Sequence, residues 1–96
     1  MTPYRVDIYI GSDNGSRKIC KNYLNKVRDW ANSTFPDGYT LVRGEGCYRG
    51  ISEDSILLNV LSDYDVVLRE RLKKLKLNLK QDSILVVKSA VNVEVI

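Results

Sequence analysis

Apolar and polar residues alternate over residues 4–10, which is the period of a strand with one buried face. A cluster of turn-forming and helix-capping residues follows at 11–15, and apolar residues then recur at helical spacing over 17–31. The sequence at 35–38, Phe-Pro-Asp-Gly, ends this helix in a turn. The first part of the chain therefore predicts a strand followed by a helix.

The rest of the chain repeats this arrangement after one additional strand. Residues 39–43 and the mostly aliphatic residues 56–61 predict the second and third strands, and residues 83–87 predict the fourth. Between the third and fourth strands, Asp63 is the expected cap of a second helix. Four leucines at steps of four, three and four give that helix one apolar stripe: Leu68, Leu72, Leu75 and Leu79. Valines alternate along the tail, 90–96, which predicts a fifth strand on an edge of the sheet or in a neighbouring subunit.

The order strand, helix, strand, strand, helix, strand is that of the ferredoxin-like plait, an α+β fold with both helices on one face of the sheet. We expect residues 1–96 to form one such domain, since the chain is too short for a cleft between two domains. The other sheet face is then free for solvent, a ligand or further subunits, and the valine-rich tail favours an oligomer. This fold hosts many unrelated functions, so no activity follows from it alone.

Composition narrows the class of protein. The chain has 44% hydrophobic and 28% charged residues, and it contains no apolar run long enough to cross a membrane. Its first residues lack a signal-peptide pattern, so we expect a cytoplasmic protein. Cys20 and Cys47 have no CxxC spacing and histidine is absent, which argues against structural zinc and Cys/His catalysis. The net charge of +3 favours the approach of an anionic ligand without requiring nucleic acid.

The segment 43–55, between the second and third strands, holds the candidate site. Its glycines are expected to take positive φ angles and to let the backbone approach a ligand closely: Gly44, Gly46 and Gly50. The same segment offers a π face, a cation and two carboxylates: Tyr48, Arg49, Glu53 and Asp54. The alternative interpretation is a long hairpin connection whose polar residues are simply solvated.

Three motifs resemble the phage S-adenosylmethionine lyases, formerly called hydrolases. These are GCYR at 46–49, the acidic pair that opens EDSILLNV at 53–60, and QDSILVVKS at 81–89. The family is similar to the PII-like proteins, which are trimers of a ferredoxin-like fold with adenosine-containing ligands bound between subunits. The resemblance thus implies a homotrimer with an adenosine-containing small-molecule ligand, and it implies neither a metal nor a cofactor.

The resemblance also implies roles for individual residues. Glu53 is the expected catalytic carboxylate, with Asp54 as the alternate, and their alternation along a strand means that only one faces the site. Gly46, Tyr48 and Arg49 are expected at the substrate, where the Tyr48 ring suits the sulfonium and Arg49 a carboxylate or phosphate. Some lyases of this type act on an S-adenosylmethionine–AMP signal of type III CRISPR antiviral defence. The sequence does not choose between the free and the adenylated substrate.

Lys88 and Ser89, from the third motif, are further candidates for substrate binding. Each of these candidates has a structural alternative. The alternative is packing at a strand edge for Tyr48, a solvated charge for Arg49 and Lys88, and a turn for Ser89.

Two other function classes stay open. One is a PII-like nucleotide-binding oligomer without chemistry, in which the glycine-rich segment binds phosphates through backbone N–H groups. The other is an RNA-binding module, since residues 7–12 resemble an RNP2 element, but residues 56–61 lack the aromatics of its partner motif. Six cations on the second helix are more simply explained as a solvated face: Arg69, Arg71, Lys73, Lys74, Lys76 and Lys80. We therefore do not expect nucleic acid as the partner.

Overall fold

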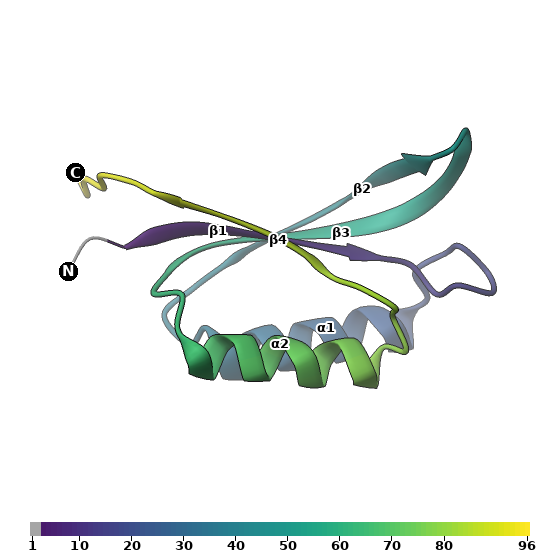
Figure 1. Cartoon of the computed structure of the whole chain (residues 1–96), viewed down its shortest axis with the longest axis horizontal. Coiled ribbons are helices and arrows are strands. Elements are labelled where there is room, and N and C mark those ends of the chain that lie inside the picture. The colour runs from purple at the N-terminus through teal and green to yellow at the C-terminus, as the bar shows by residue number, and fades with distance from the viewer. Residues whose placement is uncertain (1–2) are drawn as a thin grey trace.

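A computed structural model describes residues 3–96, which form one antiparallel sheet and two helices (Figure 1). The elements are β1 (Tyr4–Gly11), α1 (Lys21–Thr34), β2 (Thr40–Tyr48), β3 (Ile51–Ser62), α2 (Val66–Asn78) and β4 (Leu85–Ala90). The strand order β2-β3-β1-β4 and the two helices beneath one sheet face confirm the predicted βαββαβ, ferredoxin-like fold.

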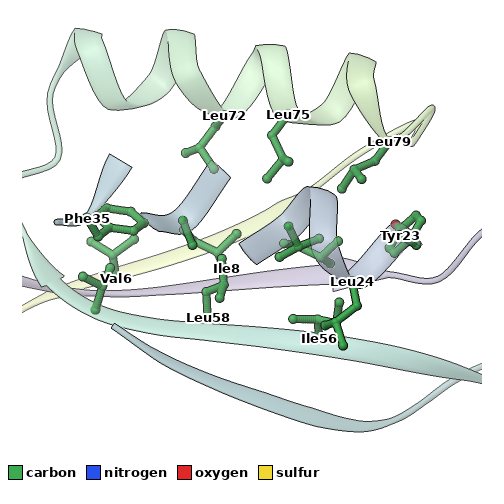
Figure 2. Packing of buried hydrophobic residues seen from close by; sticks show 14 of the residues in the cluster. Val6, Ile8, Tyr23, Leu24, Phe35, Ile56, Leu58, Leu72, Leu75 and Leu79 are labelled. Carbon is green, nitrogen blue, oxygen red and sulfur yellow. The ribbon is translucent and has the colours of Figure 1, made fainter. Parts of the chain in front are cut away.

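The core lies between the helices and the sheet face that covers them (Figure 2). On β1 and β3 alternate residues are buried, among them Ile8 and Leu58, because successive side chains of a strand point to opposite faces. The four leucines of the predicted stripe are all buried in this core, as expected, three of them on α2 and Leu79 directly after its last residue. Burying an aliphatic side chain of this size stabilises the fold by about 1.5–3 kcal/mol, so this layer fixes the positions of the strands.

Both helices begin later than predicted. α1 begins at Lys21 rather than at residue 17, because Arg17 has a left-handed backbone, with φ of 59°, and belongs to the loop that joins β1 to α1. The cap of α2 is Asp65, whose side chain accepts a hydrogen bond from the Leu68 N–H at 2.9 Å. The prediction of Asp63 as the cap was wrong by two residues.

The segment 43–55 is not a loop. β2 runs to Tyr48 and β3 starts at Ile51, and these residues pair across a two-residue turn. Arg49 and Gly50 form the turn with φ of 51° and 77°, the two positive angles of a type I′ hairpin. Positive φ was therefore predicted correctly for Gly50 but wrongly for Gly44 and Gly46, which continue β2.

The tail does not form a fifth strand within the chain. β4 ends at Ala90, three residues later than predicted, and residues 91–96 carry no regular structure. One hydrogen bond, from the Val91 N–H to the Pro3 carbonyl at 3.4 Å, holds its start beside β1. Beyond it, Val93 and Val95 are exposed. Among the described residues, β4 is therefore an edge strand of the sheet.

The sheet face opposite the helices carries an apolar row across all strands. Val42 pairs with Leu57, Leu57 with Tyr9, and Tyr9 with Leu85, so the row follows the hydrogen-bonding direction. No element among residues 3–96 covers it, and Tyr9 and Val42 are 44% and 48% exposed. Aliphatic side chains flank Tyr9 on both sides, so the row lacks the second stacking aromatic of an RNA-recognition motif.

Candidate functional site

A polar cluster surrounds the C-terminal end of β1. Ser12 is fully buried there, and its hydroxyl donates to Oε2 of Glu53 at 3.2 Å. The Tyr23 hydroxyl, at one end of the core (Figure 2), donates to the Gly11 carbonyl. Nε2 of Gln81 donates to the Ser12 carbonyl at 2.6 Å and to the Tyr23 hydroxyl at 3.0 Å. Side chains from α1, β3 and the α2–β4 loop thus meet at one point of the backbone.

Burial of the Tyr23 ring raises the pKa of its hydroxyl to about 12. The hydrogen bond from Gln81 opposes this shift, while the charges of Asp13 and Glu53 add to it. Tyr23 therefore stays protonated at neutral pH and serves as a hydrogen-bond donor rather than as a base.

Glu53 lies on the open face of the sheet. It pairs with Gly46, and the neighbouring even-numbered residues of β3, such as Ile56, face the helices. The side chain is half-buried between two shallow depressions of about 200 and 380 Å³. Tyr48 and Arg17 share the smaller depression with it. The structure thus brings the predicted carboxylate and the predicted π face together.

Asp54 has different contacts. Its Oδ2 accepts the Ile19 N–H at 3.2 Å, and its backbone N–H donates to the Arg17 carbonyl at 3.0 Å. It borders the larger depression together with Glu53, but these bonds tie the β1–α1 loop to β3. The two carboxylates therefore divide as strand alternation predicts, with Asp54 towards the loop and Glu53 towards the open face.

The tip of the hairpin is exposed. The Arg49 guanidinium carbon lies 5.2 Å from the centroid of the Tyr48 ring, and that tyrosine is 69% exposed. In the free chain, a cation of the protein therefore already stacks on Tyr48. A Cβ at Gly46 would make only ordinary contacts, 3.8 Å from the Ser55 Cβ at the nearest, so no close approach requires a glycine there.

Lys88 and Ser89 lie at the opposite end of the sheet. Lys88 pairs with Val6, and its Nζ lies 4.6 Å from the centroid of the Tyr64 ring. Glu53 lies past Gly11, at the other end of β1, so about 17 Å of strand separates the two places. A single chain does not bring Lys88 and Ser89 to Glu53.

Sequence reasoning missed four residues around Glu53. Ser12 was assigned to a turn and cap, Tyr23 to an apolar helix face, and Arg17 to the helix. Gln81 was noticed only as the first letter of a motif. The motif at 81–89 was the one signal for this contact. Its first residue, Gln81, contacts the end of β1, whereas its last two residues lie far from Glu53.

Within residues 3–96, no three acidic or cysteine side chains gather as a metal site would need. Neither helix of this region is long and apolar enough to span a membrane. Comparison of the sequence with models of protein families and with curated proteins gave no match.

Proposed function

We propose that the protein is a lyase that cleaves S-adenosylmethionine, or its adenylated derivative, to homoserine lactone and a methylthioadenosine-type product. The observation that carries the proposal is that Glu53 and Tyr48 line the same depression. An anion and a π face at one depression suit a substrate that carries both an ammonium and a sulfonium. The motifs at 46–49, 53–60 and 81–89, which resemble those of the phage lyases, support the same assignment.

The reaction needs little chemistry from the protein. The α-carboxylate of the methionine moiety attacks its own Cγ, the Cγ–S bond breaks, and the electron pair returns to sulfur to give a neutral thioether. No proton has to move. The protein chiefly has to hold the methionine chain folded, which is catalysis by orientation.

In this reaction, Glu53 is best suited to bind the ammonium group of the substrate. The sulfonium loses its charge in the transition state, so a carboxylate beside it would stabilise the substrate more than the transition state. The ammonium keeps its charge throughout, so a salt link to Glu53 orients the chain without that cost. Tyr48 then faces the sulfonium as a binding contact, weaker than an ion pair, once its own Arg49 has moved aside to a phosphate of the adenylated substrate.

The proposal includes a homotrimer, in which a neighbouring copy of the chain completes each site. Ligand pockets typically enclose roughly 300–1,000 Å³ and cover most of the ligand. The depressions of about 200 and 380 Å³ beside Glu53 are open and lie below or near the lower end of that range. The uncovered apolar row with Tyr9 and Val42 offers a surface for subunit contact. Lys88 and Ser89 would reach Glu53 only from a neighbouring subunit.

The test is incubation of the purified protein with each substrate and detection of both products by mass spectrometry. Glu53→Gln keeps an acceptor for Ser12 but removes the charge, and we expect it to lose turnover. Asp54→Asn tests the alternate carboxylate, and Glu70→Gln, on the exposed face of α2, is the matched control. Unchanged turnover in Glu53→Gln would refute its role. If neither substrate gives product but both still bind, the remaining interpretation is a nucleotide-binding oligomer without chemistry.

Mixing two variants tests the shared site. If Lys88 acts from a neighbouring subunit, Glu53→Gln and Lys88→Ala are each inactive, and refolding them together restores activity at sites that combine two intact residues. Lack of recovery in mixed oligomers would show that Lys88 does not complement Glu53 across the interface.

A further inference from the structure

A groove of about 250 Å³ separates α2 from the segment that leads into β4, far from Glu53. Its floor is apolar and consists of Tyr64, Leu72, Ile84 and Val86. Its wall on α2 carries three cations, Arg69, Lys73 and Lys76, against one lining carboxylate, Asp82. Figure 1 shows that α2 and β4 lie on the same side of the fold.

The three cations lie on one face of α2, at steps of four and three residues. Lys73 lies 3.1 Å from Glu70, an exposed pair that neutralises it only weakly. Arg69 and Lys76 form no salt bridge with any residue of the described range. Cations therefore outnumber carboxylates by three to one in the lining of this groove.

The strand beside the groove has a free edge. β4 pairs with β1 alone among the described strands, so the backbone groups on its outer side have no strand partner. Its side chains alternate: Val86 and Lys88 face the groove side, while Leu85 and Val87 are 62% and 42% exposed on the open face. An unpaired, partly apolar edge of this kind is a template for a further strand.

We propose that this edge binds an extended acidic peptide, which adds to β4 as a fifth strand. Backbone hydrogen bonds supply affinity, and the alternation of side chains supplies specificity. One set of peptide side chains lies beside Leu85 and Val87 on the open face, so it is apolar. The other set points towards the α2 cations, so it is acidic. The expected ligand is a segment in which apolar and acidic residues alternate.

The probe is a fluorescent peptide of alternating valine and glutamate, long enough to span β4, and binding is followed by anisotropy at low salt. We expect it to bind, and a peptide of alternating valine and lysine not to bind. Arg69→Glu should weaken binding roughly tenfold, because a contact to a cation becomes a repulsion. Lys76→Gln should weaken it less, since it only removes a charge. The matched control is Lys74→Glu, which makes the same change on α2 outside the groove lining, and it should have little effect.

Hydrogen exchange of the β4 amides distinguishes strand addition from simple charge attraction. We expect alternate amides of β4 to exchange freely in the free protein, since its outer edge has no strand partner, and to become protected when the peptide is bound. Binding without this protection, or equal losses in Arg69→Glu and Lys74→Glu, would overturn the proposal. So would self-association through β4 that the peptide fails to displace, because the occupant would then be a second copy of the chain.

Discussion

The hydrogen bonds around the end of β1 predict an energetic coupling between Tyr23 and Gln81. Tyr23→Phe removes a hydroxyl that donates to the Gly11 carbonyl and accepts from Gln81. Gln81→Met keeps a similar shape but removes the bonds to Tyr23 and to the Ser12 carbonyl. At about 1 kcal/mol of net stability per bond, each variant loses about 2 kcal/mol in the free energy of unfolding.

The double variant loses less than the sum of the two. The bond between Tyr23 and Gln81 is counted in both single variants but is lost only once. Three bonds at about 1 kcal/mol give about 3 kcal/mol for the double variant, so the coupling energy is about 1 kcal/mol.

Urea unfolding at one fixed protein concentration measures these values, because stability depends on concentration if the protein forms an oligomer. Tyr39→Phe is the control, since its hydroxyl bonds only the exposed Asn32 side chain at 2.7 Å. It should cost less than about 0.5 kcal/mol. Additive losses for Tyr23→Phe and Gln81→Met, within about 0.5 kcal/mol, would refute a direct contact between the two side chains.

Three further predictions concern stability. Gly50→Ala should cost about 1 kcal/mol, because its φ of 77° disfavours a side chain, whereas Gly46→Ala, at ordinary contact distances, should be nearly neutral in urea unfolding. Asp65→Ala should cost about 1 kcal/mol through loss of the α2 cap, and Asp63→Ala much less; a larger loss at Asp63 would contradict the cap assignment. Because the pKa of Tyr23 is raised from 10.0 to about 12 on folding, its contribution to stability is present below pH 10 and is lost as the pH rises to about 12. The stability difference between the parent and Tyr23→Phe should shrink over that range, and an unchanged difference would argue against burial of the hydroxyl.

Periodicity was sufficient to predict the fold, because β1, β3 and the two helices each bury one regular face. Leu72 and Leu75 lie on the buried stripe that their spacing predicted, and alternation placed Ile8 and Leu58 correctly. Element ends were predicted less well. Two glycines inside β2, Gly44 and Gly46, look like loop residues by composition, yet backbone pairing with β3 keeps them extended.

The surroundings of Glu53 could not be predicted from local patterns. Ser12 and Gln81 are distant in sequence and meet only after β1 has been placed between β3 and β4. Short polar residues such as Ser12 usually serve in turns and caps, so their presence near a turn carries no sign of a buried contact. Only the position of Gln81 at the start of a motif drew attention to the α2–β4 loop.

The position of Glu53 depends on more than its own strand. The pairing of β1 with β3 stops at Gly11 and Ser55, whereas β2 and β3 remain paired to the hairpin tip, so Glu53 lies on a two-stranded ribbon. Such a ribbon is only marginally stable by itself. Two side-chain contacts join it to the rest of the fold, Ser12 to Glu53 and Asp54 to the Ile19 N–H. These contacts therefore set the orientation of the Glu53 side chain, whichever ligand it binds. Gln81 contributes indirectly, because it donates a hydrogen bond to the Ser12 carbonyl. A substitution at Gln81 should thus affect the site without touching the ligand.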